Sequence, residues 1–486
     1  MNPSPARLMV SAAHKSSGKT TLSLGLAAAF AARGLAVQTF KKGPDYIDPM
    51  WLALASGRPC FNLDTYIGNE DAARTCFGQA AAGADLSLVE GNKGLFDGVA
   101  LDGSNSNAAL ARLLGLPVLL VIDARGMTRG VAPLILGYQA FERDIRIGGV
   151  ILNAVGGARH ESKLRSVIEH YTDVPVLGAM AQDARLALGE RHLGLVPAAE
   201  VDDAAQYVRR VAAATAAQVD LVRVLALARS APPLPWADLA PASQSLEGPR
   251  LRIGVARDRA FGFYYAQDLA ALEAAGAHLV FIDTLSDARL PRLDGLFIGG
   301  GFPEVHMDAL EANAALRLAL REAIADGLPV YAECGGLMYL ARSLQWQGRV
   351  AQMVGAIPAD SVMHERPVGR GYVHLHETGD FPWPAGAASA GCAEAEIRAH
   401  EFHHSSLENL DPGLRFGYRV TRGHGVDGQR DGLVWGNVLA SYAHRRSVGD
   451  AAWAPRFVAF VRRIAGERQL HLGSSVPPAA RQTVVA

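Results

Sequence analysis

Two short segments of this sequence combine residue types and spacing that could carry out chemistry. The first is SSGKTT, which covers residues 16–21 and lies between an apolar run and an Ala/Leu-rich segment. In a strand–loop–helix setting, backbone N–H groups and a helix N-terminus face phosphate, Lys19 adds positive charge and Thr20 can bind Mg²⁺. We expect Gly18, Lys19, Thr20 and Thr21 to bind ATP. The usual pattern starts with Gly, which is Ala13 here, so the alternative is a chance Gly-Lys-Thr loop.

Carboxylates that follow predicted strands could complete this site. Asp45 and Asp48 come just after the strand predicted at residues 36–40, and Glu90 ends the strand predicted at 86–90. Ligands of open α/β sheets bind at the C-terminal ends of strands, and Mg²⁺ prefers oxygen ligands. We therefore expect these carboxylates to border the substrate, and we expect Thr20, Asp48 and Glu90 to bind Mg²⁺. Turn and helix-cap roles are the alternative.

The second segment places a cysteine at a sharp corner. YAECGGLMYL, residues 331–340, has the pattern of strand, tight turn and helix that exposes a nucleophile, here Cys334. The helix N-terminus favours a thiolate, and the N–H of Gly335 could stabilise an oxyanion. Gly300 and Gly301 follow another predicted strand and could complete the oxyanion hole. The alternative is a buried structural cysteine.

A thiol nucleophile needs a base, and His444 in ASYAH is our choice. A second group of histidines spells H-E-x-x-H at residues 400–404, which is the zinc-protease pattern. That pattern requires a helix, because both histidines must lie on one face. Residues 395–402 instead alternate apolar and polar side chains, which predicts a strand and disfavours zinc.

The elements that position these residues read as two α/β domains. A chain of 486 residues is too long for one core, and alternating apolar runs and helical patterns predict parallel sheets buried on both faces. We expect a P-loop domain over 1–229, a Pro-, Ser- and Ala-rich linker over 230–249, a second domain over 250–466 and a flexible tail over 467–486. The strands predicted in the first half are 7–10, 36–40, 86–90, 117–123, 149–153 and 174–177, with a helix at 20–33. Those predicted in the second half are 251–256, 279–282, 295–298, 328–332 and strands around 433–440. Asn153, at the end of one strand, is a further candidate for contact with the nucleotide.

Composition excludes several functional classes. Lys and Arg number 47 against 48 Asp and Glu, so we expect neither nucleic acid nor an anionic membrane as a partner. The cysteines Cys60, Cys76, Cys334 and Cys392 lie far apart, which is typical of reduced thiols and not of a disulfide framework. The sequence shows no signal peptide and no long apolar stretch, so we expect a soluble cytoplasmic protein.

With both sites in view, the chain resembles the cobyrinate a,c-diamide synthase family of glutamine-dependent amidoligases. The resemblance extends from near Leu8 to near Gly466. It rests on SSGKTT, FKKGPDYIDP, NLDTY, EGNKGLFDG, ERHLGLVP, GGGFPE, YAECGGLMYL, HEFHHS and ASYAH, in this order. The family implies a deethiobiotin-synthetase-like P-loop domain fused to a class I-type glutaminase domain.

The resemblance also implies a reaction. Cys334, with His444 as its base, would release ammonia from glutamine through a glutamyl thioester. ATP would phosphorylate the a and c acetates of a cyclic tetrapyrrole, and ammonia would displace the phosphate. Lys19 and Thr20 would hold nucleotide and metal, while the acceptor region would be bordered by Asp45, Asp48, Glu90 and Asp97. The implied partners are ATP, glutamine and a carboxylate-rich tetrapyrrole, and a homodimer is compatible with the family.

Two departures leave alternatives open. The acid that class I glutaminases carry two residues after the histidine is Arg446 here, which leaves a dyad of Cys334 and His444. The Gly-Tyr-Arg-Glu stretch of the family is replaced by RGYVHL at residues 370–375. A sister branch amidates sirohaem for dissimilatory sulfite reductase, and sirohaem is the alternative acceptor. A partitioning-type ATPase switch without amidation is a remote alternative, against which Cys334 argues.

Overall fold

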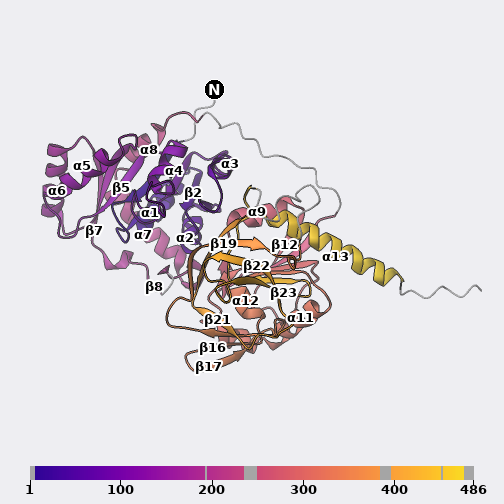
Figure 1. The fold of residues 1–486 in the computed structure, drawn as a ribbon. Helices are drawn as coiled ribbons and strands as arrows, with labels where there is room; N and C mark the ends of the chain where they lie inside the picture. The colour runs from indigo at the N-terminus through magenta and orange to yellow at the C-terminus, as the bar shows by residue number, and fades with distance from the viewer. Residues whose placement is uncertain (1–5, 192–193, 235–248, 384–395, 450–451, 475–486) are drawn as a thin grey trace, which may run out of the picture. The chain divides into compact units, whose positions relative to one another are not determined.

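The computed structural model describes residues 6–191, 194–234, 249–383, 396–449 and 452–474. The chain divides into two compact units, one of residues 1–243 and 265–267 and one of residues 244–264 and 268–486 (Figure 1). Helix α8 (Leu221–Arg229) ends where we expected the linker to begin, and strand β10 (Leu251–Ala256) starts just after its expected end. Most of the expected linker, and Cys392, lie outside the described residues.

The first unit is built on a seven-stranded sheet in the order β3-β2-β4-β1-β5-β6-β7. All its strand pairs are parallel, which confirms the predicted sheet type. Its strands are β1 (Ala6–Ala12), β2 (Val37–Lys42), β3 (Phe61–Leu63), β4 (Leu86–Glu90), β5 (Val118–Asp123), β6 (Ile147–Val155) and β7 (Val176–Ala181). Every residue of β1, β2 and β4 is buried, as expected of a sheet covered on both faces. Strand β3, only three residues long, was not predicted.

Helices surround this sheet. They are α1 (Lys19–Ala31), α2 (Ile47–Ser56), α3 (Glu70–Ala81), α4 (Asn107–Leu114), α5 (Val131–Phe141), α6 (Ala158–Tyr171), α7 (Ala204–Gln218) and α8. Helix α1 begins at the residue that follows Gly18, as the phosphate-loop pattern predicts. It packs closely on α7, because a Cβ at Gly25 would lie 1.9 Å from the Thr215 hydroxyl oxygen. Two short strands, β8 (Glu190–Arg191) and β9 (Gly194–Leu195), complete this unit.

The second unit contains a nine-stranded sheet in the order β12-β10-β13-β15-β24-β23-β22-β19-β20. The half from β12 to β24 is parallel, and the half from β24 to β20 is antiparallel. The parallel strands are β10, β12 (Ala277–Ile282), β13 (Gly295–Ile298), β15 (Val330–Glu333) and β24 (Val438–Ser441). The antiparallel strands are β19 (Gly369–Glu377), β20 (Ile397–His403), β22 (Arg415–Arg422) and β23 (Arg430–Trp435). The sequence located the parallel half but neither β19 nor β22, whose alternating polar residues leave no apolar run.

Smaller elements complete the second unit. The two smaller sheets are β17-β16-β18-β21 and β11-β14. Their strands are β11 (Phe261–Phe263), β14 (Gly300–Gly301), β16 (Ser343–Trp346), β17 (Arg349–Gln352), β18 (Asp360–Met363) and β21 (Ser405–Glu408). The helices are α9 (Ala266–Ala274), α10 (Met307–Ala312), α11 (Ala314–Ala325), α12 (Gly335–Leu340) and α13 (Ala454–Ser474).

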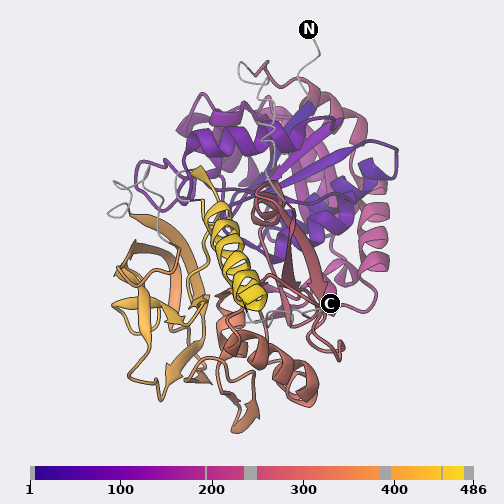
Figure 2. The same cartoon turned by 90° about the vertical axis from the view of Figure 1, so that its right-hand side faces the viewer.

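Helix α13, drawn in yellow in Figure 2, anchors the strand that leads to Cys334. Tyr331 of β15 stacks on Phe297 with ring centroids 5.4 Å apart, and its ring lies 4.6 Å from that of Trp453, next to the start of α13. Such aromatic burial gives β15 a rigid base. The helix continues to Ser474, so it includes the first residues of the tail expected from 467, and its apolar side chains up to Ala465 pack in the core of this unit. Residues 475–486 lie outside the described residues.

Candidate active sites

The predicted phosphate loop connects β1 to α1, and its conformation depends on Gly18. Gly18 has φ +88°, a left-handed conformation that favours glycine. A Cβ at this position would also lie 2.1 Å from Nδ2 of Asn153. Asn153 Nδ2 donates a hydrogen bond to the Ser17 carbonyl at 2.9 Å. Asn153, which we predicted to contact the nucleotide, therefore supports the loop itself.

Lys19, Thr20 and Thr21 begin helix α1 and point to different partners. Burial and the nearby Lys41 lower the pKa of Lys19 to about 8, although the carboxylates of this site partly oppose the shift. Thr20 Oγ1 donates to Glu90 Oε1 at 2.8 Å and lies 3.3 Å from Asp48 Oδ2. The Thr21 hydroxyl hydrogen-bonds to the phenol of Tyr207 in α7. Thr20 is thus the member of the loop that the structure joins to the predicted metal-binding carboxylates.

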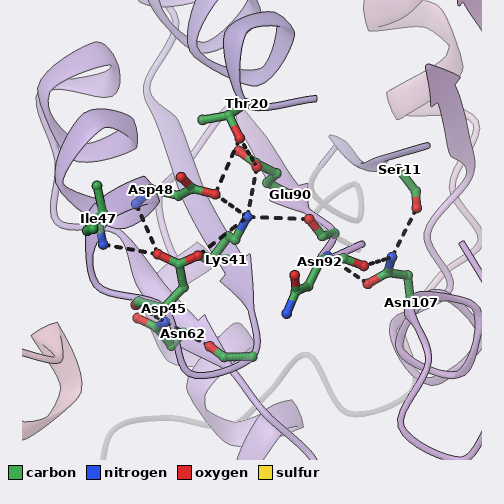
Figure 3. A network of polar contacts seen from close by, with 12 residues as sticks. Ser11, Thr20, Lys41, Asp45, Ile47, Asp48, Asn62, Glu90, Asn92 and Asn107 are labelled. Atoms are coloured by element: carbon green, nitrogen blue, oxygen red, sulfur yellow. Dashed lines mark hydrogen bonds and ion pairs between the residues drawn. The ribbon is translucent and has the colours of Figure 1, made fainter. Parts of the chain in front are cut away.

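Lys41 lies at the centre of this site, although we did not predict a role for it from the sequence (Figure 3). Its Nζ is 2.5 Å from Asp48 Oδ2 and 2.8 Å from Glu90 Oε1. Burial alone would lower the pKa of Lys41, but the surrounding carboxylates outweigh it and hold that pKa well above its usual value. The available signal was a lysine pair at the end of a strand in a sheet expected to be buried on both faces, where a buried charge needs a partner.

The carboxylates of the site differ in what they bind. Glu90 is fully buried, and burial raises its pKa while Lys41 opposes that shift. Its Oε2 has no hydrogen-bond partner among the residues that the structure describes, which leaves a buried oxygen available for a cation. Two carboxylates and one hydroxyl that converge in this way fit Mg²⁺, which usually keeps several waters.

Asp45 fills the capping role that we gave as the alternative. Its Oδ1 accepts hydrogen bonds from the N–H groups of Ile47 and Asp48, both at 3.0 Å, at the start of α2. Its Oδ2 lies 4.0 Å from Lys41 Nζ. Burial and the charge of Asp48 raise the pKa of Asp45 to about 7. A carboxyl group with such a pKa is partly protonated at neutral pH, unlike the usual metal ligand.

Asp97 lies in the loop after β4, away from the contacts of Lys41. Its side chain is exposed, and its Oδ2 accepts from the Gly94 N–H at 2.9 Å. Its negative charge acts to raise the pKa of Lys19. Asn107, which the sequence did not point to, fixes this loop by donating to the carbonyls of Asn92 and Gly94, both at 2.7 Å.

In the second unit, Cys334 occupies the sharp corner that the sequence predicts. It lies between β15 and α12 with φ +48° and ψ −101°, a backbone conformation that is costly for a residue other than glycine. The Cys334 N–H donates to the Ser441 carbonyl of β24 at 2.7 Å, which fixes the corner. Its side chain is buried. Strain held by such packing is typical of a functional position.

His444 is fixed beside Cys334 by contacts from two directions. Its backbone pairs with His400, with N···O distances of 2.7 and 3.1 Å. The Asp431 carboxylate accepts from the N–H groups of the two preceding residues, Tyr442 and Ala443. Burial alone would lower the pKa of His444, but hydrogen bonds to Cys334 and the carboxylate of Glu333 raise it to about 10. These interactions favour the protonated, imidazolium form of His444.

The predicted oxyanion-hole glycines gather around this pair. A Cβ at Gly300 would lie 2.7 Å from Cε1 of His444. A Cβ at Gly335 would lie 3.0 Å from the Gly301 nitrogen. Glycine at these positions lets the backbone come close to the reacting groups, as an oxyanion hole requires.

Residues 400–403 of the H-E-x-x-H segment lie in strand β20, which confirms the predicted strand, and His404 follows its end. Glu401 accepts from the N–H groups of His424 and Gly425, so its carboxylate has a structural role. The His403 ring stacks on that of Tyr442, with centroids 3.8 Å apart. Within the described ranges, no three His, Cys, Asp or Glu side chains are arranged to hold a metal ion. The atypical RGYVHL stretch lies in β19, the neighbour of this strand.

Comparisons with known proteins cover both units. Residues 8–196 match a CobQ/CobB/MinD/ParA nucleotide binding domain, and residues 252–450 match a CobB/CobQ-like glutamine amidotransferase domain. A cobyrinate a,c-diamide synthase of Magnetococcus marinus is 47% identical over 460 residues, which cover 94% of this chain and 97% of that protein. One from Methanosarcina acetivorans is 40% identical and covers 91% of this chain and 92% of that protein.

A solved structure, of PurLQS from Thermotoga maritima, is 16% identical over 44% of this chain and 99% of that one, with a TM-score of 0.34. Among the helices that the structure describes, none has the length and apolar character needed to span a membrane.

Proposed function

The chain belongs to the cobyrinate a,c-diamide synthase family, and on that premise we propose that it amidates the a and c acetates of cobyrinate with ATP and glutamine. It is an amidating ligase with a nucleotide-binding domain and a glutamine amidotransferase domain. One observation carries the proposal. The elbow cysteine Cys334 contacts His444, whose pKa is raised to about 10. The same chain carries a phosphate loop in which Thr20 contacts the carboxylates of Asp48 and Glu90.

In the first unit, the proposed reaction activates the acceptor. The N–H groups after Gly18 and the ammonium of Lys19 would bind the phosphates of ATP. Thr20, Asp48 and Glu90 would hold Mg²⁺, which neutralises phosphate charge when bound. A carboxylate is a poor electrophile, so transfer of the γ-phosphate to an acetate creates a leaving group that ammonia can displace. Shelter from water keeps ammonia unprotonated and nucleophilic.

In the second unit, the proposed reaction releases ammonia from glutamine. The Cys334 thiolate would attack the carboxamide carbon, while the N–H groups near Gly300, Gly301 and Gly335 stabilise the oxyanion. His444 would give its proton to the departing nitrogen and then activate the water that hydrolyses the thioester. The contacts of His444 with Cys334 support this assignment.

The decisive experiment offers cobyrinate and sirohaem in parallel, with ATP, Mg²⁺ and glutamine, and weighs the products by mass spectrometry. Two amides gained on cobyrinate would support the proposal, whereas a gain on sirohaem alone would assign the chain to the sirohaem-amidating branch. Cys334→Ser should abolish the reaction with glutamine and leave the reaction with ammonia. Lys19→Ala should abolish both. Retained glutamine use in Cys334→Ser would refute the thiol site, and ATP hydrolysis without any amide would favour a switch ATPase.

The substrates also suggest where the enzyme acts. ATP and glutamine are metabolites of the cytoplasm, and we place the reaction there, with small molecules as its partners.

A further inference from the structure

The residue that precedes the elbow cysteine, Glu333, faces the imidazole of His444. Glu333 Oε2 lies 3.5 Å from His444 Nδ1. The exposed fractions of their side chains are 2% and 3%, so solvent does not screen this pair. The sequence predicts a dyad, because the usual acid position after the histidine is Arg446. The structure brings an acid to the same imidazole from a different strand.

The fold explains how two adjacent residues both reach one histidine. Glu333 is the last residue of β15, and it lies in register with Ser441 of β24. The chain turns sharply at Cys334, so the Cys334 side chain does not follow the alternating side-chain directions of the strand. His444 follows Ser441 by a short connection after β24. The nucleophile and the acid therefore approach the imidazole from the end of one strand, while the imidazole comes from the end of the next.

The carboxylate of Glu333 is itself held in place. Its Oε1 accepts from the Tyr331 hydroxyl at 2.6 Å and from the Arg445 N–H at 2.9 Å. Both donors are buried, and Tyr331 belongs to the aromatic cluster under β15. These contacts occupy one oxygen and leave Oε2 directed to His444. These hydrogen bonds hold the buried carboxylate in one orientation.

We propose that Glu333 is the third member of the glutaminase site, a positioning residue that holds the Nδ1–H of His444 and stabilises its imidazolium form. With Nδ1 engaged by Glu333, Nε2 of the ring is the nitrogen left to face the Cys334 sulfur. An acid in this position fixes the tautomer of a catalytic histidine, as the aspartate of serine proteases does. The inference deepens the proposed function and rests on it.

A solely structural role for Glu333 is the competing explanation. His444 also meets His400 of β20, whose pKa is lowered to about 3 by burial and by the charge of His444. His400 is therefore neutral and adds no negative charge beside the imidazolium. Among the described residues, Glu333 is the carboxylate that contacts His444. This makes its charge, and not only its hydrogen bonds to Tyr331 and Arg445, the property to test.

The experiment compares Glu333→Gln, Glu333→Asp and Tyr331→Phe in the full chain. Glutaminase kcat should fall by about 10²-fold or more in Glu333→Gln, with KM for glutamine changed by less than about threefold. Glu333→Asp should recover part of the loss, because it keeps the charge. Tyr331→Phe, which removes one support of Oε1 only, should lower kcat by less than about tenfold. Alkylation of Cys334 by iodoacetamide, measured against pH, should lose the reactivity of the wild type near neutrality in Glu333→Gln.

Amidation driven by added ammonia is the control for the fold, and it should stay unchanged in all three variants. Unchanged glutaminase kcat and an unchanged alkylation profile in Glu333→Gln would overturn the inference. So would a loss of ammonia-driven amidation together with glutaminase activity, because that result would assign Glu333 to the fold. The proposed function fails separately, if Cys334→Ser retains glutaminase activity.

Discussion

Replacement of Lys41 by methionine tests the charge balance at the nucleotide site. Lys41 is buried and bridges Asp48 and Glu90, at 2.5 and 2.8 Å. The variant keeps a side chain of similar length but leaves the fully buried Glu90 without its cation. Breaking a buried ion pair by removing one partner costs about 3–5 kcal/mol, because the remaining charge has no compensation.

The loss of stability in Lys41→Met should depend on pH, and the ionisation of Glu90 determines the direction of that dependence. Glu90 can avoid being an unpaired buried charge by taking up a proton. For a carboxyl group with the ordinary pKa of 4.5, protonation costs about 4 kcal/mol at pH 7.5 and about 1.4 kcal/mol at pH 5.5. A carboxyl whose pKa is raised by folding favours the folded state at low pH, and this contribution is lost as pH rises. The variant should therefore lose about 4 kcal/mol of local stability at pH 7.5 and less than half of that at pH 5.5.

Amide hydrogen exchange followed by mass spectrometry, without added Mg²⁺ and corrected for intrinsic exchange at each pH, measures this loss strand by strand. Peptides from β2 and β4 should lose protection, while peptides of the second unit serve as the internal control. The matched variant is Lys42→Met on the same strand. Lys42 is also buried, donates to the Asn105 carbonyl and has its pKa lowered by burial, so its replacement should cost about 1 kcal/mol. Equal losses in the two variants, or a Lys41→Met loss that does not change with pH, would refute the reasoning.

Three further predictions concern glycine packing and His444. Gly18→Ala places a side chain on a residue with φ +88°, where its Cβ would lie 2.1 Å from Asn153 Nδ2. Amidation should therefore fall about tenfold or more with either nitrogen source, while glutaminase activity persists. Gly300→Ala would press on the His444 ring at 2.7 Å and should lower glutaminase kcat about tenfold, whereas Gly379→Ala, in open space, should be neutral. Because the pKa of His444 is raised to about 10, its imidazole should stay protonated from about pH 7 to 9, and the ¹⁵N chemical shifts of its ring nitrogens should be constant there. A titration of this ring near its ordinary pKa would contradict the pairing of His444 with Glu333 and Cys334.

Patterns of neighbouring residues predicted the strands and the turn whose formation depends mainly on those neighbours. The largely apolar runs at residues 86–90, 251–256 and 295–298 coincide with β4, β10 and β13, because a strand buried on both faces is rich in apolar residues. The corner at Cys334 was predicted for a similar reason, since strand, turn and helix follow one another along the chain. The antiparallel strands β19 and β22 have one polar face, so their signal was too weak to locate them.

The sequence alone determined the family, the two α/β units and the residues whose chemistry depends on immediate neighbours, such as Lys19 in its loop and Cys334 at its elbow. Only the tertiary structure decided which charges meet. Lys41 reaches Glu90 because β2 and β4 are adjacent in the sheet, and Glu333 reaches His444 because β15 pairs with β24. These partners are far apart along the chain, and a buried charge is stabilised by whatever the strand order brings within a few ångströms of it, which no local pattern records.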